Sequence, residues 1–257
     1  MAYTHLLVDN KFLSFHRKSM KRRDFLKSEP IDLSSEPQKI APKAAPKAAP
    51  DTQSRTQAQR TAISDKAMLD AAIELILEHG TDKTTLAAIG EKAGYSRGLA
   101  TYRFGSKAGL YDEVCKSISR HWLDYLKADV GDKIGIDAMS AALESFFQFV
   151  SDSPREARVL QILYCGAASP KSEYRQTSAG IHQRQQDDVA AWVRAGQAEG
   201  SIRASADPKS IAAQYIAYIS GMTYLWLINP QSIDFRKAND DMKLHLKISL
   251  SPQPSDT

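Results

Sequence analysis

The sequence predicts an all-α protein with an N-terminal three-helix domain and a larger C-terminal helical domain. Downstream of residue 64, apolar residues recur at helical spacing, and no segment alternates as a half-buried strand does. Helix-start signals also recur along the chain. Ser153-Pro154, Ser169-Pro170 and Asp207-Pro208 each place a capping residue before a proline that suits the first helical position, and Ser153 with Glu156 is expected to form a capping box.

The N-terminal segment differs in composition from the rest of the 257 residues. Residues 1–60 hold 12 Lys and Arg against 6 Asp and Glu, and they carry too little apolar surface to offset the entropy of folding. The motif from Lys21 to Lys27 looks like a twin-arginine export signal, but polar residues follow it instead of the apolar stretch that such a signal needs. We therefore expect a disordered basic extension, rich in proline and alanine, over residues 1–60, and a disordered tail over residues 251–257.

Three helices are expected between the extension and residue 107. Ser64 is the expected N-cap of the first helix, which carries an apolar stripe and ends at His79-Gly80. Thr84 or Thr85 caps the second helix. Gly94 then supplies a tight turn, because glycine accepts the left-handed conformation at little cost.

The remaining helices follow from caps and breaks. Ser96 and Ser106 are expected to cap the third and fourth helices. From the fourth helix onward, the expected helical ranges are 107–129, 136–151, 154–168, 171–198, 208–228 and 232–249.

The third helix has the residue types of a helix that reads the DNA major groove. At 100° per residue, Ala100 and Phe104 point together toward the core, while Gly98 and Tyr102 lie on the opposite side. Its outward face is therefore slim near the base edges and basic near the phosphates. The candidate DNA-binding residues are Thr84, Thr85, Ser96, Arg97, Gly98, Leu99, Thr101, Tyr102, Arg103 and Lys107.

Side-chain chemistry divides the tasks among these residues. An arginine at position 97 can fork onto a guanine, and Leu99 and Thr101 can meet a thymine methyl group. Arg103 and Lys107 can reach phosphates. The start of the second helix offers free N–H groups and the hydroxyls of two threonines to another phosphate.

The same residues resemble a known family. The pattern Gly80…Thr84-Thr85…Ile89-Gly90…Ala93-Gly94-Tyr95-Ser96-x-Gly98…Tyr102-Arg103-Phe104-x-Ser106-Lys107…Leu110 closely resembles the N-terminal domain of the TetR family of transcriptional regulators. The stretches 195–203 and 226–230 are similar to signatures of the family's ligand domain. The resemblance implies a homodimer with a helix-turn-helix DNA-binding domain over residues 62–122 and a helical effector-binding and dimerisation domain over residues 123–250.

The chain departs from the family pattern at one place. Thr101 stands where the family often has a phosphate-contacting tyrosine, and Arg103 stands where it often has a histidine. This departure favours Arg103 and Lys107 over Tyr102 as phosphate contacts.

Aromatic and apolar side chains in the C-terminal helices suggest two further surfaces. Most of them suit a core and a dimer interface, but some would line a site for an apolar effector. The candidate effector-binding residues are Phe147, Tyr164 and Trp192. The candidate dimer-interface residues are Tyr215, Tyr218, Met222, Leu225, Trp226, Leu244 and Ile248.

Several other classes of protein are not expected. The histidines are scattered and form no metal-ligand pair, so we expect no catalytic residues, no metal site and no cofactor; His182 is expected on a solvated face. Cys115 and Cys165 are expected as small buried apolar side chains. No apolar run approaches the roughly 20 residues that span a bilayer. We therefore expect a cytoplasmic protein with no membrane partner.

The expected function is that of a sequence-specific DNA-binding transcriptional regulator that acts as a homodimer on a palindromic, double-stranded DNA operator and responds to a small-molecule effector. In this mechanism the effector changes the tilt of the fourth helix, and with it the spacing of roughly 34–36 Å that two recognition helices need. The alternative is a helical ligand-binding or scaffold protein whose DNA-reading helix no longer functions. Repression and activation both remain open.

Overall fold

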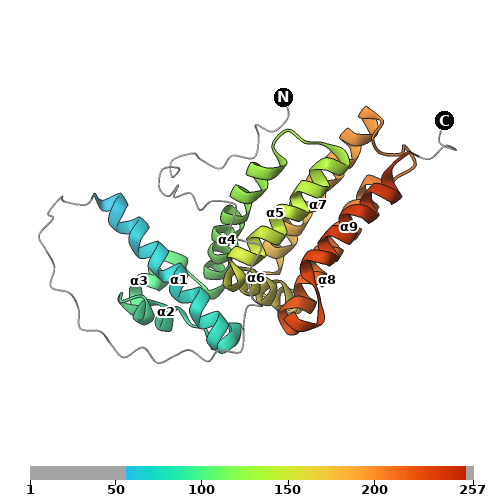
Figure 1. The fold of residues 1–257 in the computed structure, drawn as a ribbon. Coiled ribbons are helices and arrows are strands. Elements are labelled where there is room, and N and C mark those ends of the chain that lie inside the picture. The colour runs from blue at the N-terminus through green and yellow to red at the C-terminus, as the bar shows by residue number, and fades with distance from the viewer. Residues whose placement is uncertain (1–55, 253–257) are drawn as a thin grey trace, which may run out of the picture. The chain divides into compact units, whose positions relative to one another are not determined.

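The computed structural model describes residues 56–252, which form nine α-helices and one short 3₁₀ helix without any strand (Figure 1). The all-α prediction is confirmed for this part of the chain. The predictions for residues 1–55 and 253–257 lie outside the described residues. The helices are α1 (Gln57–Lys83), α2 (Leu86–Lys92), α3 (Arg97–Phe104), α4 (Lys107–Val130), α5 (Gly135–Asp152), α6 (Pro154–Ala167), α7 (Arg175–Glu199), α8 (Pro208–Ile228), η2 (Pro230–Ser232) and α9 (Phe235–Leu250).

Helix α1 begins earlier than the sequence indicated. Thr56, not Ser64, is its N-cap: Thr56 and Gln59 bond each other's backbone N–H groups in a capping box. Ser64 lies inside the helix, where its hydroxyl donates to the Thr61 carbonyl oxygen at 2.8 Å. Gly80 breaks the helical backbone at the predicted point, with φ of 75°.

The turn between α2 and α3 has the predicted construction. Thr85 accepts the Ala88 N–H and Ser96 accepts the Leu99 N–H, so each caps its helix. Gly94 has φ of 78°. The two helices also approach closely at Gly90, where an added Cβ would lie 2.8 Å from a backbone oxygen of the turn.

The C-terminal helices match the predicted order; α4, α6 and α8 begin at the predicted residues, whereas α7 and α9 begin four and three residues late. Ser153 forms no side-chain cap bond to α6, and Ser169-Pro170 begins no helix, since α7 starts only at Arg175. Glu156, the other half of the expected capping box, bonds a histidine of α4 instead. Asp207 caps α8 as predicted, through the N–H groups of the second and third residues of that helix.

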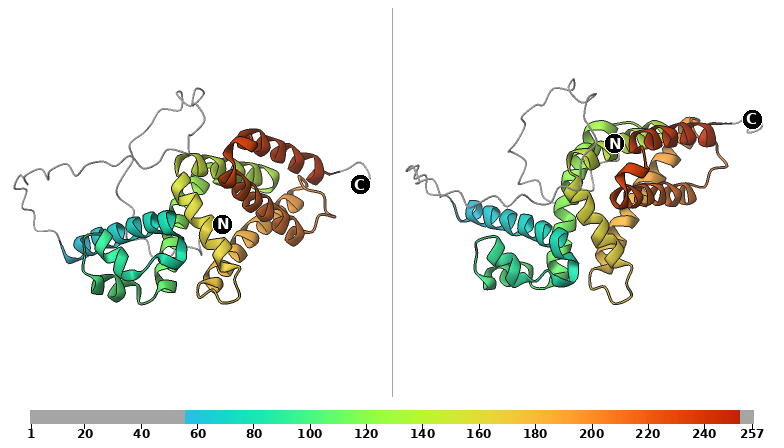
Figure 2. Two further views of the ribbon diagram at one scale, coloured as in Figure 1. Left: turned by 90° about the horizontal axis from the view of Figure 1, so that it is seen from below. Right: turned by 60° about the horizontal axis from the view of Figure 1, so that its bottom comes forward.

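Two apolar clusters form the core. The first joins α1, α2, α3, the start of α4, the end of α5, α6 and the start of α7; the second joins the end of α4 with the rest of α5 and α7, α8 and α9. Helix α4 contributes to both, from Leu110 in the first cluster to Val130 in the second. Figures 1 and 2 show α4 to α7 between the α1–α3 helices and the α8–α9 helices. Helix α4 therefore connects the two apolar clusters directly.

Two expectations were wrong, one about apolar segments of membrane-spanning length and one about the burial of a cysteine. Helix α8 is long and apolar enough to cross a membrane by length and composition, contrary to the sequence expectation, and only 17% of its apolar window is buried. Cys165 is exposed, whereas Cys115 is buried as expected. Burial raises the pKa of the Cys115 thiol to about 12, and Asp112 adds to this shift.

Candidate nucleic-acid interface

Helix α3 presents one face to solvent and one to the core. Ala100 is fully buried and Phe104 packs against the first apolar cluster. Gly98 is exposed, and Tyr102 on the same side is 83% exposed. Thr101 is exposed beside them, whereas Leu99 packs partly against the first cluster. The face that the sequence assigned to DNA is therefore free of intramolecular packing at its centre.

Arg97 stands at the start of this face. Its Nε donates to Glu91 Oε1 at 2.7 Å, and the two side chains also form an ion pair between α3 and α2. Both side chains are more than half exposed. Because an exposed pair is weakly held, Arg97 can leave Glu91 for a base or phosphate at small cost.

Arg103 does not lie on the exposed face. Its Nε and Nη2 donate to Asp65 Oδ1 and Oδ2 of α1, both at 2.7 Å. The Arg103 side chain is only 26% exposed. The structure thus turns this predicted phosphate contact toward α1, because a carboxylate there accepts its guanidinium fork.

The two threonines of the predicted phosphate site at the start of α2 lie in different environments. Thr84 is fully buried and its hydroxyl donates to the Gly80 carbonyl oxygen at 2.8 Å, so it is not available to a phosphate. Thr85 is exposed at the N-cap. Lys107 donates to the Asp82 carbonyl oxygen at 3.0 Å, which holds its ammonium group near the α1–α2 connection.

Acidic partners neutralise much of the local positive charge. Lys92 of α2 pairs with Glu74 and Glu78 of α1, at 3.2 Å to each. Burial opposes the charged form of Lys92, but the hydrogen bonds that Lys92 donates to the two glutamates outweigh it and raise the pKa. The interface therefore presents mainly polar and aromatic groups, with Arg97 as its exposed cation.

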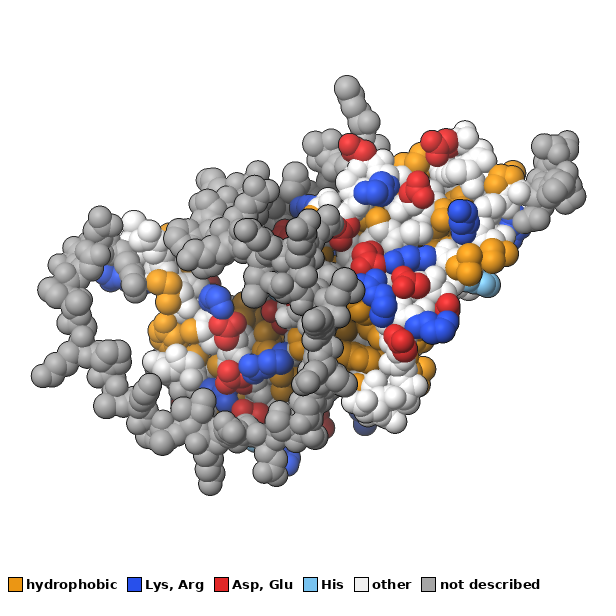
Figure 3. Space-filling model, in the orientation of Figure 1, with side chains coloured by type: hydrophobic (Ala, Val, Ile, Leu, Met, Phe, Trp, Pro, Cys, Tyr) orange, Lys and Arg blue, Asp and Glu red, His pale blue; other side chains and the backbone are white. Residues whose placement is uncertain are grey.

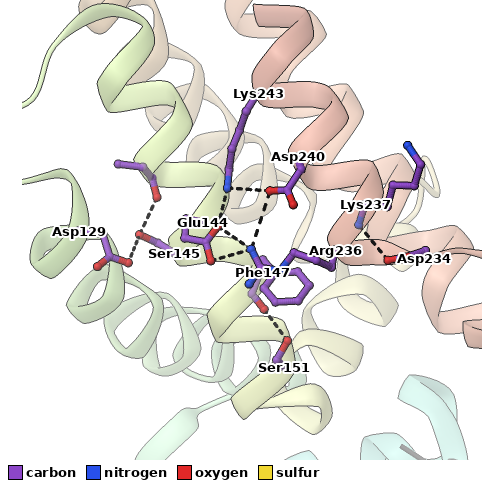
Figure 4. A network of polar contacts seen from close by, with 11 residues as sticks. Asp129, Glu144, Ser145, Phe147, Ser151, Asp234, Arg236, Lys237, Asp240 and Lys243 are labelled. Atoms are coloured by element: carbon purple, nitrogen blue, oxygen red, sulfur yellow. Dashed lines mark hydrogen bonds and ion pairs between the residues drawn. The ribbon is translucent and has the colours of Figure 1, made fainter. Parts of the chain in front are cut away.

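The three predicted effector-binding residues do not lie together. The ring of Phe147 packs against that of Phe235 in a tilted arrangement, with centroids 5.6 Å apart, and lies under the Arg236 guanidinium, in the polar network between α5 and α9 (Figure 4). Trp192 belongs to the second apolar cluster, whereas Tyr164 packs against the first. Aromatic composition alone does not assign a side chain to a cluster, so the sequence could not separate these three residues.

Tyr164 instead lies beside polar atoms of α7. Its ring centroid is 4.5 Å from that of His182, which is half-buried and not on a solvated face as expected. His182 Nδ1 and, one turn earlier, Ser178 Oγ are buried without a hydrogen-bond partner among residues 56–252. Burial lowers the pKa of His182, and a hydrogen bond with Gln185 offsets this only in part. The imidazole is therefore neutral near pH 7.

The predicted dimer-interface residues divide into three groups by burial. Leu225, Leu244 and Ile248 are exposed at 49%, 57% and 64%, as an unpaired interface requires. Tyr215 is buried, and its hydroxyl donates to the Met139 carbonyl oxygen at 2.7 Å, so it belongs to the subunit core. The others are partly buried: Tyr218, Met222 and Trp226.

Sequence reasoning missed four residues of these surfaces. Asp65 and Glu91 hold the two arginines of α3, and each is recognisable only once the helices are placed. Tyr224 and Ile228 add exposed apolar area to the α8 face, at 46% and 64% exposure. Their helical spacing from residue 221 was a usable signal.

Elsewhere, over α5 and α9, basic and acidic side chains are interspersed (Figure 3).

Two family profiles match the chain. Residues 68–114 match the profile of bacterial regulatory proteins of the tetR family. Residues 136–250 match the profile of the C-terminal domain of BetI-type transcriptional repressors. Together they span most of the described residues.

Individual proteins agree with the profiles. The transcriptional regulator TtgR of Pseudomonas putida is 28% identical over 182 residues, which are 65% of this chain and 81% of TtgR. The SmeT–triclosan complex has a TM-score of 0.63 at 23% identity, covering 74% of this chain and 93% of SmeT, the Stenotrophomonas maltophilia repressor. FadR of Bacillus subtilis in complex with stearoyl-CoA also has a TM-score of 0.63, at 18% identity, covering 71% and 97%. The chain has a helix-turn-helix whose recognition helix is exposed to solvent, and family profiles match both its N-terminal and its C-terminal half. The chain therefore belongs to the TetR family of transcriptional regulators.

Proposed function

We propose that this protein is a cytoplasmic, ligand-responsive repressor that binds a palindromic operator as a homodimer. One observation carries the DNA-binding part: α3 is anchored through Ala100 and Phe104, and so presents Gly98, Thr101 and Tyr102 to solvent. A helix with a slim exposed face can enter the major groove, where Arg97 can read a guanine. This surface argues against the alternative of a DNA-reading helix that no longer functions.

Selection of bound sequences from a random double-stranded DNA pool tests this part. We expect enrichment of two inverted half-sites whose centres lie about one helical turn, or roughly 10 base pairs, apart. Tyr102→Ala and Arg97→Ala should weaken binding to the selected operator, and Lys171→Ala, on a loop of the C-terminal domain, is the matched control. Failure of the pool to converge on any sequence would refute the proposal.

The homodimer is supported by the exposed apolar face of α8 and α9. On α8 the exposed positions 217, 221, 224, 225 and 228 follow helical spacing, so they form one stripe. Gly221 lies within that stripe with nothing within 4 Å of an added Cβ, and a small residue there permits close helix approach. A second copy of the chain would cover this apolar area and remove it from water.

The effector is proposed to bind beside Tyr164, Ser178 and His182. The last two carry the buried atoms without hydrogen-bond partners, and a ligand group could satisfy both. Because His182 is neutral and burial raises the pKa of the Tyr164 hydroxyl, the site favours an uncharged, mainly apolar molecule with a hydrogen-bonding group. SmeT and FadR, which share the fold, are described in complex with triclosan and with stearoyl-CoA.

Helices α4 and α6 offer a route from that site to the DNA. His121 of α4 bonds Glu156 of α6 at 2.7 Å, and the neighbouring Arg155 lies 3.7 Å from Glu74 of α1. An effector that favours one arrangement of α6 would therefore bias the tilt of α4 and α1 together. Screening a panel of uncharged phenols and alcohols for release of operator DNA tests this step. Loss of release in His182→Phe, with DNA affinity unchanged, is the expected result; release that persists in this variant would refute the site.

A further inference from the structure

We propose that Asp65 of α1 is a positioning residue for DNA recognition, which holds the end of α3 in place through Arg103. This inference rests on the proposed binding of DNA by α3. It assigns a role to a residue that lies on a different helix from the proposed DNA-reading face.

Asp65 and Arg103 form a bidentate pair that fixes α3 to α1. Arg103 Nε and Nη2 each donate to a separate oxygen of the Asp65 carboxylate, both at 2.7 Å. Such bidentate pairing fixes the plane of the guanidinium as well as its distance. The two residues are 38 positions apart in sequence, so the pair ties two helices that the chain does not connect directly.

Helix α3 needs such a restraint because it is short and packs only sparsely on the side of α1. It has eight residues and ends at Phe104, one residue after Arg103, with Gly105 as its C-cap at φ of 69°. Its backbone packs mainly against α2 and α4, and only sparsely against α1. The apolar anchors Ala100 and Phe104 lie on one face, so a bond at the edge of the helix restrains rotation about its axis.

The same geometry argues against Arg103 as a phosphate contact. Moving Arg103 to DNA would leave the Asp65 carboxylate, itself only 39% exposed, without its partner and close to a polyanion. Arg97, by contrast, is 72% exposed, and its exposed pair with Glu91 costs little to break. The structure therefore gives the two arginines of α3 different tasks.

The two roles predict opposite results for Asp65→Ala. If Asp65 positions α3, its loss weakens operator binding, and Arg103→Ala weakens it about as much, each by about tenfold, the scale of one disturbed base contact. If Asp65 merely competes with DNA for Arg103, its loss tightens binding. Affinity should be measured by fluorescence anisotropy on the selected operator and on a scrambled duplex, over a range of salt concentrations.

The salt dependence separates the roles independently. Loss of a phosphate contact lowers the slope of log affinity against log salt by about 0.9, whereas loss of a positioning residue leaves it unchanged. We expect Arg103→Ala to keep the wild-type slope and its affinity for scrambled DNA. The double variant D65A/R103A should be no weaker than either single variant, and the charge-swapped D65R/R103D should recover most of the lost affinity.

Controls keep a folding defect apart from a recognition defect. Asp70→Ala removes the same charge from the same helix, where Asp70 bonds only Lys66 at 2.6 Å, and should leave affinity near that of the wild type. Thermal melts establish whether each variant is folded. A variant that does not fold is replaced by Asp65→Asn or Arg103→Lys, which keep part of the hydrogen bonding between the two side chains. Tighter binding by the Asp65 variant, or a reduced slope for the Arg103 variant, overturns the proposal. Failure of the wild-type protein to select any operator would instead refute the proposed function and not this pair.

Discussion

Arg97 and Glu91 form a hydrogen-bonded ion pair across the helix-turn-helix, with the Nε of Arg97 2.7 Å from Glu91 Oε1. The exposed cation of the recognition helix is thus held by an acid of the preceding helix while no DNA is bound. Both side chains remain largely solvated, so the pair costs little to break and orients Arg97 in the meantime.

This pair predicts that Glu91→Gln tightens operator binding. The substitution frees Arg97 and removes a negative charge from the surface that meets DNA, so affinity should rise, by roughly two- to tenfold at low salt, and less at high salt. Anisotropy titrations at two salt concentrations measure the change. Glu113→Gln, which removes the same charge from α4, is the control. Unchanged affinity would mean that Arg97 does not have to leave Glu91 to bind DNA.

Gly98 and Gly90 should respond differently to the same methyl group. An added Cβ at Gly98 meets nothing within 4 Å, so Gly98→Ala should stabilise α3 by roughly 0.5–1 kcal/mol. The same methyl group would project from the exposed face and weaken operator binding. Thermal melts and anisotropy separate the two effects. Operator affinity equal to wild type would show that this position does not approach DNA.

Gly90→Ala should instead destabilise the domain. Its Cβ would lie 2.8 Å from the Ser96 carbonyl oxygen, which belongs to the backbone and cannot rotate away. The α2 and α3 helices would have to separate, with a loss of about 1–3 kcal/mol, as is usual for overpacking. Chemical denaturation measures the loss. A free energy of unfolding equal to that of the wild type would contradict the close approach.

The sequence was sufficient to predict the features that depend on residues close together in the chain. Thr85, Ser96 and Asp207 cap their helices as predicted, because a cap is decided by residues two or three positions away. The order of the helices followed in the same way. Ser153 shows the limit, since its expected partner Glu156 bonds His121 of another helix instead.

The sequence was not sufficient for contacts between helices. Arg103 has the chemistry of a phosphate contact, and only the position of Asp65 assigns it elsewhere. His182 stands in a polar run, but the packing of α6 against α7 brings it to Tyr164. Such pairs depend on how helices pack, and a helical period does not specify which helix is opposite.

The exposed face of α8 predicts the effect of charge on assembly. Leu225→Asp and Ile228→Asp should each shift the protein from dimer to monomer, because a carboxylate would be buried in an apolar interface. Operator affinity should fall on the order of 100-fold, since two half-sites would no longer be bound by one molecule. Sedimentation velocity measures the assembly. Leu123→Asp, at an exposed position of α4, is the control, and a dimer that survives both α8 substitutions would place the interface elsewhere.

Glu144 of α5 predicts a specific dependence of stability on pH. It accepts two hydrogen bonds from Arg236 at 2.8 Å and one from Lys243 at 2.5 Å (Figure 4). Burial opposes ionisation of this carboxyl group, but Lys243 and Arg236 outweigh it and lower its pKa. A carboxyl group with a lowered pKa in the folded state stabilises the protein above its pKa in the unfolded chain, about 4.3.

Glu144→Gln should therefore destabilise the protein at pH 7, and the difference from wild type should shrink as the pH falls from about 4.3 through the lowered folded-state pKa. Since the pair is partly solvated, salt should also reduce the difference. Urea denaturation at a series of pH values measures both effects. Asp241→Asn, which removes an exposed pair with Lys237 on α9, should change stability little at any pH. A difference between wild type and Glu144→Gln that stays constant down to pH 3 would contradict the ionic role of Glu144 and leave only packing as its contribution to the α5–α9 contact.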